Sequence, residues 1–126
     1  MTDLINHPST PLRARKCAPC ESIGSPLSEE EIKNYLSQLK DGWAVTNTNQ
    51  RGPSSLVKKI TKGFKFEDFV KAMEFINKIA IVAEQEGHHP DIAIHYNKVD
   101  ITLWTHFING LSINDFIIAA KIDAIL

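Results

Sequence analysis

Three stretches of the chain repeat apolar residues every three to four positions, which predicts three helices. The first covers residues 28–39 and opens with a capping box, a cap hydroxyl followed three residues later by a glutamate. The second covers residues 66–86 and is ended by Gly87. Ser112 opens the last helix, and the carboxylate of Asp115 stands at its third position.

The two longer helices distribute their apolar residues differently. In helix 66–86 one stripe is expected to face the core. The stripe comprises Phe66, Phe69, Val70, Met73, Ile76, Ala80 and Ala83. The last helix carries two apolar faces, made of Phe116, Ile117 and Ala120 and of Ile118, Ile122 and Ile125. This is more apolar surface than one sheet covers, so we expect part of it to serve self-association.

Four shorter segments have the composition and spacing of strands. Residues 43–46 and 56–60 form one pair, joined by a polar loop that contains Gly52-Pro53. Residues 91–96 and 99–104 form a second pair, close enough in sequence for a tight hairpin. The order α-β-β-α-β-β-α predicts an α+β fold, with a four-stranded antiparallel sheet and helices packed on one face.

Residues 1–27 differ from the rest of the chain. They hold four of the six prolines and show neither a helical nor a strand period. We expect an extended or partly mobile N-terminal arm in front of a single domain over residues 28–126.

Composition and charge narrow the class of protein. The 126 residues include 43% hydrophobic and 23% charged side chains, which is ordinary for a chain with one core. The 14 basic and 15 acidic residues give a net charge of -1, so no basic surface for nucleic acid is expected. No apolar run approaches the ~20 residues of a membrane span, and no secretory signal is visible. We therefore expect a cytoplasmic protein that binds neither nucleic acid nor membrane.

Two histidines meet in the second hairpin if its turn centres on residues 97–98. The apolar face then pairs Tyr96 with Val99, Ile94 with Ile101 and Ile92 with Leu103. The other face pairs His95 with Asp100, Ala93 with Thr102 and Asp91 with Trp104. Extending this ladder places His89 opposite His106, on the sheet face away from the core.

His88 precedes His89 directly, so three imidazoles are expected around one spot. Pro90 favours an extended backbone at His89. Imidazole exchanges protons near neutral pH, which makes the cluster a candidate acid/base site. Two other interpretations stay open: the histidines are ordinary polar surface residues, or they bind Zn²⁺. Against zinc, neighbouring side chains on an extended chain point to opposite sides, and no HExxH motif is present.

Three further features have both a structural and a functional interpretation. Asp115 completes a capping box and can also border a site. Trp104 can stack on a flat ligand or simply cover the sheet. Cys17 and Cys20 form a CxxC pair outside the context of a redox motif, so we favour two reduced thiols that pack the arm onto the domain. A redox or metal-binding module is the alternative.

Taken together, these residues resemble a known signature. Glu84-x-x-x-His88-His89-Pro90, followed by Tyr96, His106 and Asp115 and by the segments NKVDITLWTH and GLSINDF, resembles the pterin-4a-carbinolamine dehydratase family. That family is also called the dimerisation cofactor of a homeodomain transcription factor. The resemblance covers residues 28–126, and the arm with KCAPCE resembles the bacterial and plant-type branch.

The resemblance implies a reaction and its setting. A 4a-hydroxytetrahydropterin would lose water to give quinonoid dihydropterin, which recycles the pterin of aromatic amino acid hydroxylases. The reaction needs no metal or organic cofactor. The same resemblance implies the α+β fold and a homodimer or homotetramer built through sheet edges and helices.

The resemblance also implies the site residues. The acid/base set would be His88, His89 and His106. We expect His89 and His106 to transfer protons and His88 to orient the pterin or share the acid role. The substrate-binding set would be Glu84, Pro90, Trp104, Thr105 and Asp115, with Thr105 acting through its backbone.

Ile92, Trp104 and Gly87 depart from residues that some relatives carry, which leaves the preferred pterin open. The competing functions are a non-catalytic dimerisation or assembly partner and an enzyme for another pterin or a folate.

Overall fold

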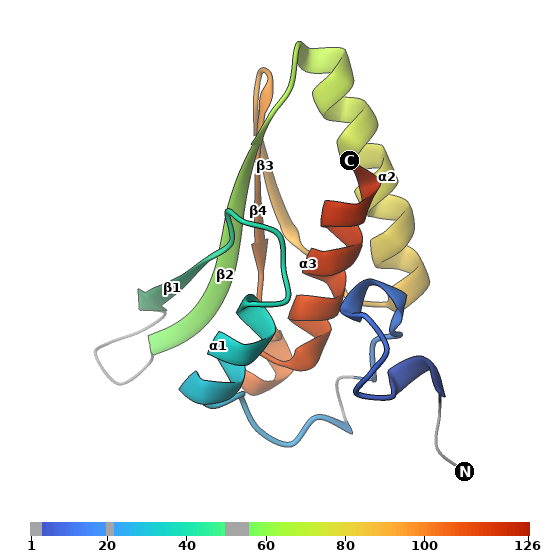
Figure 1. The fold of residues 1–126 in the computed structure, drawn as a ribbon. Helices are drawn as coiled ribbons and strands as arrows, with labels where there is room; N and C mark the ends of the chain where they lie inside the picture. Colours follow the sequence, from blue (N-terminus) through green and yellow to red (C-terminus); the bar gives the residue numbers. More distant parts are fainter. Residues whose placement is uncertain (1–3, 20–21, 50–55) are drawn as a thin grey trace.

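The computed structural model describes residues 4–19, 22–49 and 56–126 as two layers, a sheet and the helices that cover one of its faces (Figure 1). The helices are α1 (Glu29–Leu36), α2 (Phe69–Glu86) and α3 (Ile113–Ile125). The strands are β1 (Ala44–Asn49), β2 (Leu56–Lys65), β3 (Asp91–His95) and β4 (Lys98–Leu103). They lie in the order β1-β2-β4-β3, and every neighbouring pair is antiparallel. The predicted fold class and element order are confirmed.

The N-terminus of α2 lies later in the chain than the sequence pattern predicted. β2 continues to Lys65, and the carboxylate of Asp68 accepts a hydrogen bond from the backbone of Lys71 at 2.9 Å, which caps the helix. The predicted start at Phe66 is therefore wrong, and the predicted stripe is only partly right, since Ala83 is buried and Ile76 packs against the core. The buried residues of α2 are Ala72, Phe75, Ile79 and Ala83. Phe69 and Val70, which the stripe included, are exposed.

The second hairpin turns one residue earlier than predicted, at Tyr96 and Asn97. His95 faces Lys98, and Ile94 faces Val99 rather than Ile101. Tyr96 adopts a positive φ of 55°, a backbone conformation that a tyrosine rarely takes. The predicted pairs are thus wrong by two residues. An even shift keeps the side chains within the strands on their predicted faces, because side chains alternate along a strand, but Tyr96 moves into the turn and is exposed.

The tip of this hairpin is held by the segment that precedes α2. Asn97 donates a side-chain hydrogen bond to the carbonyl of Phe66 at 2.9 Å, and the Phe66 amide donates to the Asn97 carbonyl at 2.8 Å. These contacts are long-range, so the local sequence pattern could not reveal which residues form the turn.

The core lies between the sheet and helices α2 and α3. Its fully buried members include Ile60, Ile101, Leu103, Phe116 and Ile118. Burial of such side chains supplies most of the driving force for folding.

The second apolar face of α3 is covered within the chain itself. Ile118 and Ile122 are fully buried within the chain, so these two residues are not available for self-association. A short 3-10 helix of the arm, η2 (Leu12–Ala14), lies against α3 and buries Leu12 (Figure 1). Within the described residues, no helix combines the length and apolar character that crossing a membrane requires.

A buried ion pair fastens the C-terminal half of α3 to the sheet. Lys62 of β2 contacts Asp123 at 2.8 Å, and the indole of Trp43 donates to the other carboxylate oxygen at 2.9 Å. Asp123 is 2% exposed, so each of its oxygens needs such a partner.

Candidate active site

The predicted histidine cluster borders one cavity of about 580 Å³. It lies where α2 leads into β3 and where β4 leads into a 3-10 helix, η4 (His106–Ile108). The lining residues are Gly87, His88, His89, Pro90, Asp91, Trp104, His106 and Phe107. Three of the predicted site residues do not line the cavity. Glu84 contacts His89 and Asp115 contacts His88, and both histidines line it. Thr105 contacts Asp115.

His88 is the buried member of the cluster. Its Nε2 lies 2.6 Å from Oδ1 of Asp115, and the two side chains are 6% and 0% exposed. Gly87 ends α2 in the left-handed conformation, which turns the chain so that His88 can face the start of α3. Asp115 thus occupies Nε2 and leaves Nδ1 as the other ring nitrogen of His88.

Asp115 accepts hydrogen bonds from three sides. Besides His88, the Thr105 hydroxyl lies 2.8 Å from Oδ2, and the Ser112 amide donates to the same oxygen at 2.9 Å. The Thr105 and Ser112 hydroxyls are themselves 2.7 Å apart. The predicted capping box is present, and the same carboxylate that caps α3 holds His88. Because a carboxylate only accepts hydrogen bonds, this contact requires a proton on Nε2 of His88.

Thr105 is fully buried and bonded within the chain. Its amide donates to the carbonyl of Gly110 at 2.8 Å, and its own carbonyl accepts from Ile108 at 3.3 Å. Through these bonds Thr105 anchors the turn that carries His106.

His89 points in a different direction from His88. Its Nε2 lies 2.5 Å from the carboxylate of Glu84, two residues before the end of α2. Both side chains are largely exposed, at 59% and 77%. The two adjacent histidines thus have separate carboxylate partners, Asp115 for His88 and Glu84 for His89.

His106 stacks on Trp104 at the other side of the cavity. The ring centroids are 3.7 Å apart with an interplanar angle of 32°. Trp104 is fixed in turn by the Asp91 carboxylate, which accepts from its indole at 3.2 Å, and by Lys59, whose ammonium lies 4.4 Å from the ring centroid. Because β3 begins at Asp91 and β4 ends at Leu103, the predicted ladder from His89 to His106 does not exist. Both imidazoles nevertheless border the cavity.

Asp91, Phe107 and Lys59 are contributions to the site that the sequence did not single out. Phe107 is 62% exposed, which is unusual for a large aromatic side chain and was visible only as an aromatic next to His106. Lys59 comes from β2 and reaches Trp104 because β2 pairs with β4. This pairing joins strands of two different hairpins, so the pattern within each hairpin does not reveal it.

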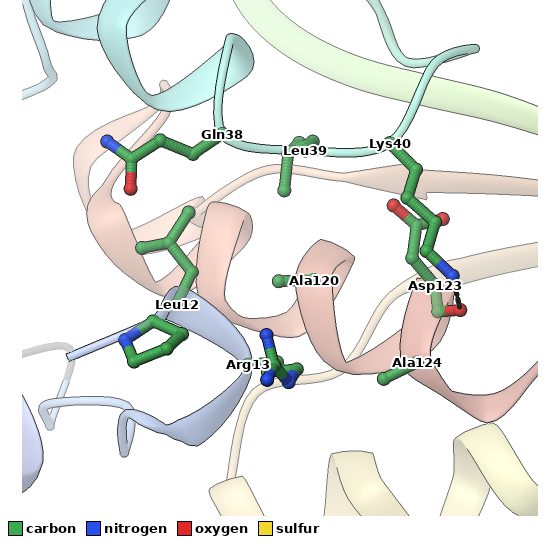
Figure 2. Close-up of a pocket in the computed structure, with 9 residues that line it drawn as sticks. Leu12, Arg13, Gln38, Leu39, Lys40, Ala120, Asp123 and Ala124 are labelled. Atoms are coloured by element: carbon green, nitrogen blue, oxygen red, sulfur yellow. Dashed lines mark hydrogen bonds between the residues drawn. The ribbon is translucent and has the colours of Figure 1, made fainter.

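A second cavity, of about 560 Å³, lies between the arm, the segment after α1 and the end of α3 (Figure 2). Figure 2 shows Leu12 and Arg13 on one side and Gln38, Leu39 and Lys40 on the other. No histidine lines it, and both carboxylate oxygens of Asp123 already have partners in Lys62 and Trp43. This cavity therefore offers neither an imidazole nor an unpartnered carboxylate among its lining residues.

Metal binding and thiol chemistry have limited support in the described part of the chain. No three His, Cys, Asp or Glu side chains in residues 4–19, 22–49 and 56–126 are grouped to hold a metal ion. Cys17 is half-buried, and its Sγ lies 3.8 Å from the Asn114 carbonyl. Cys20 lies outside the described residues, so the state of the predicted thiol pair stays a prediction.

Comparison with known proteins gives a consistent family. A family model described as pterin 4 alpha carbinolamine dehydratase matches residues 25–125. A Rickettsia canadensis protein named "Putative pterin-4-alpha-carbinolamine dehydratase" is 45% identical over 91% of this chain and 97% of its own length. A Legionella pneumophila protein of the same name is 44% identical over 91% of this chain and 95% of its own.

A solved structure agrees with these matches. It is described as a transcriptional coactivator/pterin dehydratase from Brucella melitensis, and it superimposes with a TM-score of 0.69 at 38% identity, covering 80% of this chain and 98% of its own. Together with a site that carries all three expected histidines, these matches lead to one conclusion. The chain belongs to the pterin 4 alpha carbinolamine dehydratase family.

Proposed function

We propose that this protein is a lyase that dehydrates a 4a-hydroxytetrahydropterin to quinonoid dihydropterin and water. The observation that carries the proposal is the convergence of three imidazoles on one cavity in a chain of this family. In the reaction the C4a–O bond breaks as the hydroxyl accepts a proton and leaves as water. The N5–H bond breaks as a base takes the proton, and its electron pair forms the C4a=N5 double bond. One proton is given and one is taken, so the total number of protons on the enzyme is unchanged, and proton exchange with water restores the donor and the acceptor for the next turnover.

His89 and His106 carry the proton transfers. They lie on different elements that border the same cavity, and both rings are accessible to a ligand. Each such transfer contributes about 10²–10⁴-fold to a rate. The carboxylate of Glu84 contacts Nε2 of His89 directly and helps to hold the orientation of its ring.

His88 orients the pterin. Asp115 occupies its Nε2, so a neutral ring offers Nδ1 as an acceptor for a ring N–H of the substrate. Asp115 holds this imidazole in place through its hydrogen bond to Nε2, and Thr105 holds Asp115. The fixed direction matters because reactive groups must be held within a fraction of an ångström for efficient catalysis.

The flat pterin ring finds aromatic partners in the same cavity. Trp104 and His106 are already stacked, Phe107 is exposed beside them, and Pro90 adds an apolar edge. Offset stacking on such rings supplies affinity without demanding one particular substituent on the ligand. Asp91 and Lys59 keep Trp104 in position for it.

In the cell this activity would recycle the pterin of an aromatic amino acid hydroxylase. The proposed setting is the cytoplasm, with the protein acting as a homodimer or homotetramer. The domain over residues 28–126 would carry the chemistry behind an arm of residues 1–27.

Stopped-flow absorbance tests the activity directly. A phenylalanine hydroxylase generates 4a-hydroxytetrahydropterin, and its decay is followed with and without the purified protein. We expect the decay to accelerate in proportion to protein concentration and to saturate with substrate. A folded protein that leaves the decay rate unchanged would contradict the proposal.

A partner role is the second candidate, because the Brucella melitensis structure is described as a transcriptional coactivator as well as a pterin dehydratase. A non-catalytic dimerisation or assembly partner has no need of the three histidines and their carboxylates. Absence of dehydration together with specific capture of a regulatory protein would favour this role over the enzyme.

A further inference from the structure

The N-terminal arm reaches the back of the candidate active site. The amide of Cys17 donates to Oε1 of Glu86 at 2.8 Å, and the amide of Ala18 donates to Oδ1 of Asn114 at 2.9 Å. Asn114 returns a hydrogen bond from its Nδ2 to the Ala18 carbonyl at 2.8 Å. Two consecutive arm residues thus bind two side chains from two different helices.

Those two side chains flank the His88–Asp115 pair. Glu86 is the last residue of α2, two positions before His88. Asn114 directly precedes Asp115 in the first turn of α3. The arm therefore spans the two helix ends whose next residues meet in the hydrogen bond that orients His88.

We propose that residues 17–18, bound to Glu86 and Asn114, form an arm bracket that positions His88 by fixing the distance between the ends of α2 and α3. The inference deepens the proposed function and rests on it for its catalytic consequence. Glu86 and Asn114 are positioning residues in this account, because neither lines the cavity.

The burial of the bracket supports a rigid connection. Asn114 is fully buried and the Glu86 side chain is 8% exposed. In such surroundings a lost partner leaves a polar group unsatisfied, so the bracket bonds are far more persistent than surface contacts. The paired bonds between Ala18 and Asn114 also fix the direction of the amide, which one bond alone would not do.

The bracket controls which nitrogen of His88 carries the proton. With the helix ends in place, Asp115 keeps the proton on Nε2 and leaves Nδ1 for the substrate. If the ends separate, the short bond to Asp115 weakens and the other tautomer becomes populated. The ring then presents a donor where the proposed reaction uses an acceptor.

Two variants and two matched controls test the bracket. Glu86→Ala removes the acceptor for the Cys17 amide and also the contact of Oε2 with Lys121 of α3 at 3.9 Å, whereas Glu86→Gln keeps an oxygen for the Cys17 amide and loses only the charge facing Lys121. Asn114→Ala removes both bonds to Ala18. Asn6→Ala is its control, because Asn6 also binds arm backbone, at the Lys16 amide, but contacts neither helix end through that bond. Urea unfolding first establishes that each variant is folded.

The readout is the tautomer of His88, measured from the ¹⁵N shifts of its ring nitrogens and assigned with His88→Gln. We expect the Nε2–H form in the wild type, Glu86→Gln and Asn6→Ala, and a mixture of both tautomers in Glu86→Ala and Asn114→Ala. With a 4a-hydroxytetrahydropterin as substrate, kcat should fall about 10-fold in Glu86→Ala and Asn114→Ala, as misplacement of a positioned group predicts. KM should change by less than about threefold in these two variants.

Two results would overturn the bracket. One is an unchanged His88 tautomer and unchanged kcat in folded Glu86→Ala, which remains informative even if Asn114→Ala does not fold. The other is a change of the His88 tautomer and of kcat that is as large in Glu86→Gln as in Glu86→Ala. Because the tautomer is read without substrate, an inactive wild type would contradict the proposed function and leave this test of the bracket intact.

Discussion

Single residues in this protein serve the fold and the site at once. Asp115 caps α3, and through its other oxygen it holds His88. Trp104 covers the sheet, being 7% exposed, and also supports His106 by stacking. For Asp115 the structural and the functional interpretations of the sequence are compatible, because different oxygens of the carboxylate make the two sets of contacts.

Replacing Asp115 by Asn separates these two uses. All three partners of Asp115 donate to its carboxylate and lie within 2.9 Å of it. The NH₂ group that Asp115→Asn introduces would be a donor that faces one of these donors, either His88 on one side or Thr105 and Ser112 on the other. We expect turnover of a 4a-hydroxytetrahydropterin to fall by about 10²-fold. The free energy of unfolding should fall by about 1–3 kcal/mol, because a buried polar group loses its partner. Stopped-flow kinetics and urea unfolding measure the two effects.

Asp123→Asn is the matched control for that variant. Asp123 is equally buried in α3, but its partners Lys62 and Trp43 lie away from the histidine cavity. It should lose stability and keep its turnover at temperatures where the protein is folded. Equal losses of turnover in the two variants would contradict the assigned role of Asp115.

At the scale of the element, helix starts were predictable where a local signal sets them. Both capping boxes, at Ser28 and Ser112, were read from residues three apart and are present. The start of α2 was missed because β2 continues to Lys65, and a strand's length depends on its neighbours in the sheet. The hairpin register was missed because Tyr96 takes a positive φ that its residue type does not predict.

The capping box of α1 has a predicted pH dependence. Hydrogen bonds from the backbone and side chain of Ser28 lower the pKa of Glu31 below its usual value of 4.5. A group whose pKa is lower in the folded state adds stability above its unfolded pKa and loses it as the pH falls through the folded one. We expect wild type to exceed Glu31→Gln in unfolding free energy at neutral pH, and this difference to shrink as the pH falls below about 4.5.

Urea unfolding at a series of pH values measures this difference. Glu30→Gln, in the same helical turn, is the control for a general effect of charge near the helix N-terminus. A difference between wild type and Glu31→Gln that stays constant down to strongly acidic pH would argue against the pKa shift as its source.

At the scale of the whole molecule, the site lies where segments far apart in sequence converge. The end of α2, the end of β4, the start of α3 and the arm all meet around His88. The sequence motif predicted which histidines gather, since they adjoin paired strands. It could not predict the path of the arm, because prolines and the absence of a period carry no information about long-range partners.

The central claim is that His89 and His106 transfer the protons of a pterin dehydration. The most direct measurement is the stopped-flow decay of 4a-hydroxytetrahydropterin with wild type, His89→Ala, His106→Ala and His95→Ala. His95 is the control, an exposed histidine of the same hairpin that does not line the cavity. The account predicts a loss of about 10²–10⁴-fold for His89→Ala and for His106→Ala, and a wild-type rate for His95→Ala. Wild-type rates for both cavity variants would contradict it.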